Sequence, residues 1–287
     1  MEKHVTIKNG FLTVQISNLG AELKSITDKN GEERLWQGDP DWWNGQAPLL
    51  FPICGCISEG RYLHKGLSYE LPMHGFGRES VFEVESTDGT RAVFLLKSDS
   101  ETLKVYPFEF ELRVIYELKE NRISVTYAVD NKTDGDMYFS IGSHEAYYCK
   151  GNTTEYEMFF DKNEPLINCL LDGPLLNGRT EELAYKDGAL TFTDEKFKEI
   201  DTYIFQNTLS KKVTLRRKDS DKSISVDFTG IDNLLIWKEP GAEFFCIEPW
   251  CGLPDYVGEV KEISQKSAIN KLEKDGVFEK THTIIID

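Results

Sequence analysis

The sequence has few of the features that mark secreted, membrane-spanning or metal-dependent proteins. The residues after Met1 contain neither the basic segment nor the long apolar run of a signal peptide. No apolar stretch approaches the roughly 20 residues that a membrane-spanning helix needs. The six cysteines form no Cys-x-x-Cys pair, and no two of the five histidines stand at metal-ligand spacing. We therefore expect a cytoplasmic protein with reduced cysteines, no metal and no membrane partner.

Positive charge is also scarce. The chain has 33 lysines and arginines against 49 aspartates and glutamates, which gives a formal net charge of −16 and a pI of about 4.8. Such a surface repels the phosphate backbone of nucleic acids and anionic lipids. We expect no nucleic-acid partner, although a few local cations could still hold a phosphorylated small molecule.

Helical periodicity is rare, and alternation with a period of two residues dominates. Apolar and polar residues alternate over 108–118, a turn follows at Glu120 and Asn121, and residues 123–129 alternate back. This pattern predicts an antiparallel hairpin with one buried face. One short helix is expected over 195–200. Further strands are expected over 12–16, 137–141, 156–160, 212–216, 223–228, 234–237, 244–247 and 283–286.

The composition allows these strands to form a sizeable core, because 40% of the residues are hydrophobic and 12% are aromatic. Numerous short strands separated by turn signals predict an all-β protein, either a large sandwich or a barrel. The chain has no repeat, linker or low-complexity tract. We therefore expect residues 1–287 to form a single domain.

Two histidines lie in segments that look unlike ordinary strands or turns. His74 and His144 each stand beside glycine and aromatic residues at the end of a predicted strand, and glycine lets a ligand come close. A structural role would explain either histidine alone, whereas two in similar contexts favour a site. His4, His64 and His282 lie in polar sequence, and we expect them to be exposed. The unusual segments are residues 50–56, 73–78, 140–148 and 246–255.

Glu248 is the most unusual acidic residue. It follows the apolar run 244–247, where a carboxylate is costly to bury without a partner, and it precedes Pro249, which favours extended backbone. A partly buried carboxylate has a raised pKa and can act as a general base near neutrality. The alternative is a surface glutamate at the end of a strand.

Aromatic residues gather near the same segments. Pyranose rings have apolar faces that stack on aromatic rings and hydroxyls that need polar partners, so these residues could bind a sugar. Core packing would also explain each of them singly. They are Trp42, Trp43, Phe51, Phe76, Tyr147, Tyr148, Trp237 and Trp250.

Several motifs occur in the order found in one known family. The chain resembles the aldose 1-epimerases, or galactose mutarotases, and most closely their LacX-like branch. The resemblance covers almost the whole chain and implies a large antiparallel β-sandwich. The motifs are Gly20-Ala21-Glu22-Leu23, Ala47-Pro48-Leu49-Leu50-Phe51-Pro52, His74-Gly75-Phe76, Gly142-Ser143-His144, Glu248-Pro249-Trp250 and Ile269-Asn270-Lys271-Leu272.

The resemblance also implies roles for individual residues. Glu248 matches the family's general base and His144 its general acid, while His74 matches a histidine that binds and polarises the sugar. Asp201 looks like the aspartate that holds sugar hydroxyls. Opening the ring of an aldose removes a proton from the C1 hydroxyl and delivers one to the ring oxygen, which suits a carboxylate and an imidazolium. No metal, nucleotide or other cofactor is needed.

Two positions depart from the family pattern. Cys56 stands where an arginine usually contacts the sugar, and Glu145 stands where a proline commonly follows the acid histidine. Arg61 or Arg78 could supply the missing cation.

Four functions are compatible with the sequence. The first is a mutarotase acting on a free hexose, and the second is a hexose-6-phosphate 1-epimerase that would need Arg78 or Arg61 in its pocket. The third is a non-catalytic sugar-binding protein, which Cys56 favours. The fourth is a β-sandwich polysaccharide lyase or hydrolase, because architecture alone does not fix function.

Overall fold

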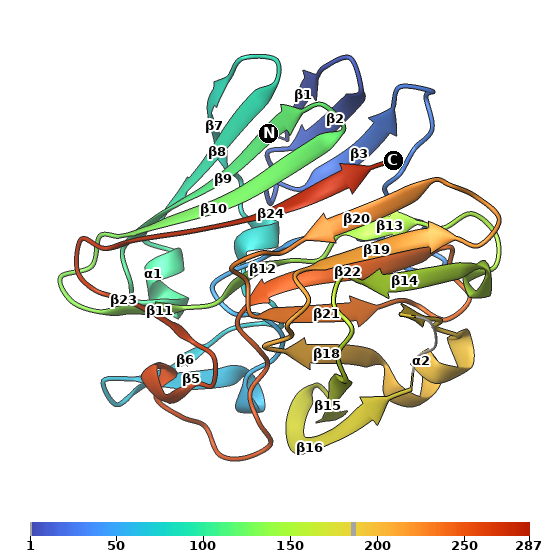
Figure 1. The fold of residues 1–287 in the computed structure, drawn as a ribbon. Helices are drawn as coiled ribbons and strands as arrows, with labels where there is room; N and C mark the ends of the chain where they lie inside the picture. Colours follow the sequence, from blue (N-terminus) through green and yellow to red (C-terminus); the bar gives the residue numbers. More distant parts are fainter. Residues whose placement is uncertain (1, 185–187) are drawn as a thin grey trace.

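The computed structural model describes residues 2–184 and 188–287 and is built mainly from two large antiparallel sheets (Figure 1). The first sheet has nine strands. In spatial order they are β17 (Ala189–Leu190), β14 (Tyr156–Phe160), β19 (Lys212–Arg217), β20 (Ser223–Asp227), β24 (Val277–Ile286), β10 (Arg122–Asn131), β9 (Phe110–Lys119), β8 (Arg91–Lys97) and β7 (Glu83–Thr87).

The second large sheet has eight strands. Seven follow one another in the order β16 (Leu175–Leu183), β15 (Leu166–Asp172), β18 (Thr202–Gln206), β21 (Asn233–Trp237), β22 (Phe244–Cys251), β12 (Ile141–Ser143) and β4 (Leu49–Leu50). The eighth strand, β13 (Ala146–Tyr148), also pairs with β22.

Smaller elements complete the fold. The small sheets are β1 (His4–Lys8), β2 (Leu12–Ser17) and β3 (Leu23–Asp28); β11 (Met137–Phe139) and β23 (Asn270–Leu272); and β5 (Arg61–His64) and β6 (Leu67–Glu70). The 3-10 helices are η1 (Ser58–Gly60), η2 (Gly77–Glu79), η3 (Thr153–Glu155) and η4 (Ile263–Gln265). The α-helices are α1 (Thr102–Val105) and α2 (Asp194–Ile200). With four and seven residues, neither is long enough to cross a bilayer, and the described residues contain no other α-helix.

The predicted hairpin is confirmed as β9 and β10, whose register pairs Leu118 with Ile123. Burial alternates along both strands, as a sheet with one core face requires. The predicted helix is confirmed as α2. The strand expected over 137–141 is divided into β11 and β12, because the Ser140 N–H donates to the carbonyl of Pro52 (2.7 Å) rather than to a sheet neighbour.

The core lies between the two large sheets, so the fold is the predicted antiparallel β-sandwich. One apolar cluster contains Ile284 from β24 together with Phe245 and Ile247 from β22. Because side chains alternate along a strand, Cys246 and Glu248 of β22 point to the opposite, outer face of the eight-stranded sheet. This outer face carries the site described next.

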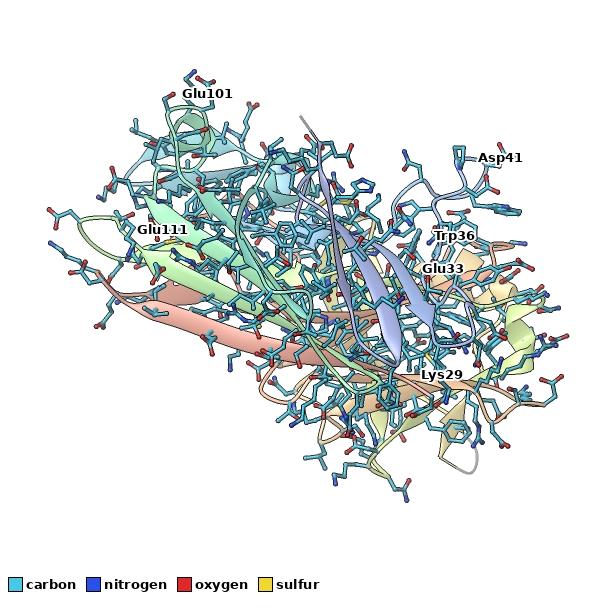
Figure 2. The ribbon with its side chains drawn as sticks, turned by 90° about the horizontal axis from the view of Figure 1, so that it is seen from above. Lys29, Glu33, Trp36, Asp41, Glu101 and Glu111 are labelled. Atoms are coloured by element: carbon cyan, nitrogen blue, oxygen red, sulfur yellow. The ribbon has the colours of Figure 1, made fainter. Side chains whose placement is uncertain are left out.

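The segment that follows β3 leaves the sandwich and passes to the side of the eight-stranded sheet. Figure 2 shows its course through Lys29, Glu33, Trp36 and Asp41. The backbone N–H of Trp36 donates to the carbonyl of Ala146 (2.8 Å), which lies next to β22. The segment thus covers part of the outer face and brings aromatic residues to it.

Candidate active site

Strand register brings His144 and Glu248 together. β12 pairs with β22 through Gly142 and Trp250, and β13 pairs with β22 through Ala146 and Cys246. Both pairings follow the same register, and between them His144 comes directly opposite Glu248. Opposite residues on one face of an antiparallel pair are close neighbours. The His144 Nδ1 atom lies 3.5 Å from the Glu248 Oε1 atom.

Burial controls the proton affinity of this pair. Glu248 is 1% exposed, and burial, assisted by the charge of Glu145, raises its pKa well above the ordinary range. Burial lowers the pKa of His144 to about 4. The Nδ1 and Oε1 atoms are buried and make no hydrogen bond. An unpaired buried polar group costs about 1–3 kcal/mol, so a ligand hydroxyl that bonds to it would be favoured.

His74 lies beside this pair in a constrained backbone. Its φ is 68°, in the left-handed region that side chains with a Cβ rarely adopt. Gly75 follows with φ +69°, and a Cβ there would lie 2.3 Å from the carbonyl oxygen of Phe51. The strained turn therefore requires glycine after His74, and such strain is often found at functional sites.

The hydrogen bonding of His74 assigns its proton. The Gly55 N–H donates to His74 Nδ1 (3.1 Å), so the ring proton of the neutral imidazole is on Nε2. Burial, with the charges of His144 and Arg78, lowers the pKa of His74 well below its ordinary value. His74 is therefore a neutral ring whose Nε2–H can donate to a ligand.

A cleft of about 260 Å³ opens between these residues. Its lining includes five of the six site residues predicted from the sequence. The lining residues are Gly55, Cys56, Met73, His74, His144, Leu171, Pro174, Asp201, Thr202, Ile204, Leu235, Trp237, Glu248, Trp250 and Pro254.

Asp201 lies at the rim of the cleft, at the C-terminal end of α2. Its φ is 63°, and its N–H closes the helix by donating to the carbonyl of Phe197 (2.9 Å). The side chain is exposed, and its Oδ2 atom accepts a hydrogen bond from the Thr202 hydroxyl (2.9 Å). The carboxylate is therefore available to accept bonds from ligand hydroxyls.

Two of the predicted aromatic residues line the cleft. The indole N–H of Trp250 donates to the carbonyl of Ser143 (2.9 Å), which holds the ring beside the segment leading to His144. A Cβ on Gly142 would lie 2.7 Å from Trp250 Cδ1, so glycine is needed there for the ring to fit. The Trp237 ring lies 5.5 Å from the His144 ring.

The other predicted aromatic residues lie outside the cleft lining. The Trp43 ring packs 5.1 Å from His144 and supports it. Phe51, Phe76 and Tyr147 contribute to the core between the sheets. Trp42 is exposed, and Tyr148 packs against the smaller outer cluster.

Neither arginine that could replace the missing cation is part of the cleft lining, although the charge of Arg78 acts on His74 and His144. Arg78 lies on η2, with its Nε 3.8 Å from a Glu79 oxygen, and is not part of the lining. Arg61 forms an exposed ion pair with Glu59 (2.6 Å). Cys56, in contrast, lines the cleft. Among the described residues, the cleft lining contains no lysine or arginine.

One group of side chains has the dimensions of a metal site. Ligand atoms of His144, Cys246 and Glu248 lie within 4.8 Å of one another. Burial and the neighbouring Glu248 raise the pKa of the Cys246 thiol well above its ordinary value. A thiol that keeps its proton is a poor metal ligand. In the absence of an ion, the group places an imidazole and a carboxylate side by side.

The prediction that His282 is exposed is wrong. The residue is fully buried, and its Nε2 lies 2.9 Å from Glu145 Oε1. The period of β24 could have revealed this, because His282 shares the buried face of Ile284 and Ile286. His4 is exposed as predicted. His64 is half-buried, with its ring 4.6 Å from that of Phe108.

Comparison with known proteins gives an independent line of evidence. A sequence model of the aldose 1-epimerase family matches residues 3–266. The plasmid-encoded protein LacX of Lactococcus lactis is 34% identical, over 98% of this chain and 99% of LacX. A galactose mutarotase related enzyme from Lactobacillus acidophilus superposes with a TM-score of 0.94 at 31% identity, over 99% of this chain and 97% of that chain. A galactose mutarotase-like protein from Lactobacillus casei gives a TM-score of 0.94 at 29% identity, over 99% and 100% of the two chains.

Proposed function

Because the chain belongs to the aldose 1-epimerase family of isomerases, we propose that it interconverts the α and β anomers of a free hexose by general acid–base opening of the ring. The observation that carries this proposal is the contact between His144 Nδ1 and Glu248 Oε1 in the cleft (3.5 Å). Both atoms are buried without hydrogen bonds. Both residues line the cleft, so the C1 hydroxyl and the ring oxygen of one sugar held there can bond to them.

In the proposed mechanism Glu248 removes the proton of the C1 hydroxyl while His144 protonates the ring oxygen. The C1–O5 bond breaks, and the open-chain aldehyde rotates about C1–C2. Reclosure on the other carbonyl face returns both protons and gives the other anomer. The raised pKa of Glu248 makes it a stronger base, and the lowered pKa of His144 makes it a stronger acid. The same shifts favour the resting state in which the proton is on Glu248 and His144 is neutral, so the state that opens the ring is the less populated of the two.

Other residues in the cleft suit sugar binding. We assign His74 Nε2–H as a donor to a sugar oxygen and the Asp201 carboxylate as an acceptor from sugar hydroxyls. Trp250 offers an apolar ring surface to the pyranose. Together they would fix the ring so that O1 and O5 face Glu248 and His144.

The proposal specifies an uncharged substrate in the cytoplasm. No lysine or arginine is found in the described cleft lining, whereas a sugar phosphate needs a cationic partner. All six cysteines are free, which supports a reducing compartment.

The decisive experiment replaces Glu248 by glutamine, which keeps the shape but cannot accept the proton. We expect Glu248→Gln to bind sugar and to lose about 10²–10⁴-fold in anomer interconversion. His144→Asn should behave in the same way, and His74→Asn should also weaken binding. Polarimetry at low buffer concentration, after subtraction of spontaneous mutarotation, measures the rates.

Glu243→Gln is a matched control. Glu243 accepts bonds from the Tyr148 hydroxyl (3.1 Å) and the Gly151 N–H (2.7 Å) and does not line the cleft. It should retain wild-type rates. Equal catalysis by wild type and Glu248→Gln would refute Glu248 as the base. A wild-type protein that binds sugar without accelerating its interconversion would identify a binding protein instead.

A further inference from the structure

Glu145 and His282 form a polar contact inside the core of the sandwich. Glu145 is 2% and His282 0% exposed, and Glu145 Oε1 lies 2.9 Å from His282 Nε2. Glu145 precedes β13 beside the eight-stranded sheet, whereas His282 lies on β24 of the nine-stranded sheet. The contact therefore joins the two sheets directly behind the candidate site.

The backbone of Glu145 is tied to the strand that carries Glu248. Its carbonyl accepts a hydrogen bond from the Ile247 N–H (3.2 Å), one residue before Glu248. His144, the preceding residue, points to the outer face, while Glu145 points to the core. Burial of such a pair adds little net stability, because desolvation offsets the attraction. Stability alone therefore does not account for it.

We propose that Glu145 and His282 are positioning residues for the proposed reaction: they hold the segment from His144 to Ala146 against β22 and fix the charge behind the Glu248–His144 pair. The catalytic consequence of this inference rests on the proposed function. The effect of Glu145 on the titration of Glu248 is expected in the protein without sugar as well.

The tyrosines around Glu145 and His282 add no charge to this part of the core. Burial raises the pKa of each neighbouring tyrosine hydroxyl well above its ordinary value, so these groups stay neutral. The Glu145 charge adds to burial in raising the pKa of Glu248. It opposes the lowering of the His144 pKa by burial. The titratable groups that contact Glu145 or interact with its charge are His282 on β24, Tyr127 on β10, Tyr116 on β9, Tyr147 on β13, Cys246 and Glu248 on β22, and the adjacent His144.

The test is a pH titration of the Glu248 carboxyl in the full chain without sugar. Carbon-13 NMR of glutamate-labelled protein monitors this titration. The Glu248 signal is assigned by its loss in Glu248→Gln. Glu145→Gln retains a side chain that can bond His282 but removes the charge, so the Glu248 midpoint should fall by on the order of one pH unit. His282→Gln retains a donor to Glu145 but removes the imidazole, so the midpoint should stay or rise.

The matched control is Glu164→Gln, since Glu164 is a buried carboxylate that accepts bonds from Leu209 and Ser210 and does not line the cleft. It should leave the Glu248 midpoint unchanged. In the kinetic assay, the alkaline limb of kcat/KM should move with the midpoint in Glu145→Gln. An unchanged midpoint in Glu145→Gln, or a fall in His282→Gln, would overturn the inference. A wild-type protein without mutarotase activity would refute the proposed function, while the titration would still decide the role of Glu145.

Discussion

Burial favours the state in which Glu248 and His144 together hold one proton. Burial opposes charge on both groups, raising the pKa of Glu248 and lowering that of His144. The two arrangements of that single proton correspond to the two halves of the proposed reaction. With the proton on His144 the pair is ready to open the ring, and with it on Glu248 the pair is ready to close it. Such a pair titrates as a unit.

This shared proton predicts a broad pH profile. Below about pH 4 His144 gains a proton while Glu248 keeps its own, so the pair lacks a base and kcat/KM should fall. As the pH rises through the raised pKa of Glu248, the pair loses its proton, and the rate should fall again. Polarimetry from pH 3.5 to 10 would measure both limbs. If the acid limb has its midpoint near pH 6.5, the ordinary pKa of histidine, then His144 is not buried in the working enzyme as it is in the structure.

Arg78 tests the nature of the substrate. Because its side chain does not line the cleft, Arg78→Ala should change the turnover of a free hexose and of its 6-phosphate by the same factor. Arg61→Ala, which removes an exposed, ion-paired arginine, is the matched control. A selective loss on the phosphorylated sugar after Arg78→Ala would show that Arg78 reaches the phosphate and would favour the hexose-6-phosphate 1-epimerase alternative.

Individual residues were predictable where their local sequence was unusual. Glu248 after an apolar run and His144 beside glycine were identified, and both line the cleft. The partnership of Glu145 with His282 was missed, because it joins residues 137 positions apart in the sequence. Arg78 stays a predicted substrate-binding residue: it is not part of the cleft lining, but its charge acts on His74 and His144.

At the scale of elements, a buried lysine anchors the helix that carries Asp201. Lys238 is 1% exposed, and its ammonium group contacts the Asp194 carboxylate and the Thr153 hydroxyl (3.1 Å). Asp194 is the first residue of α2, and its Oδ2 also accepts from the Gly241 N–H (2.9 Å). The position of Asp201 at the other end of α2 therefore depends on this anchor.

Lys238→Met should separate binding from chemistry. Removal of the ammonium group leaves Asp194 without its charged partner and should lower the free energy of unfolding by roughly 2 kcal/mol. The KM for sugar should rise because Asp201 is less well held. The kcat should change less, because strand register holds Glu248 and His144. Urea unfolding and steady-state kinetics measure these effects, with the exposed Lys222→Met as control. A fall in kcat with unchanged KM would show that α2 does not position the sugar.

Elements were predictable in proportion to their length. The ten-residue strands β9 and β10 showed a clear period of two. The strands β4, β12 and β13 have only two or three residues and show no period. The pairing of His144 with Glu248 depends on β12 and β13, so its geometry required the structure. Sequence alternation also cannot give strand order, such as β24 lying between β20 and β10.

At the scale of the whole molecule, the inner faces of both large sheets contribute to a single apolar cluster. The tryptophans report mainly on the opposite, outer face. Trp36 and Trp250 belong to the two smaller clusters there, and Trp43 and Trp237 pack against the cluster that contains Trp36. Circular dichroism in the far ultraviolet, in contrast, reports on the strands of both sheets. The two signals therefore follow different parts of one molecule.

We expect these two signals to change together when the protein is unfolded by urea. A single domain with a shared core cannot lose one sheet and keep the other, because each sheet would expose its apolar inner face. Tryptophan fluorescence and far-ultraviolet circular dichroism should give the same midpoint and the same slope with denaturant concentration. A free hexose should raise both urea midpoints equally. At a hexose concentration of 100 times the Kd, the free energy of unfolding should increase by about 2.7 kcal/mol. A fluorescence transition at lower urea than the dichroism transition would show that the cleft face unfolds separately and would refute the prediction that residues 1–287 form one domain.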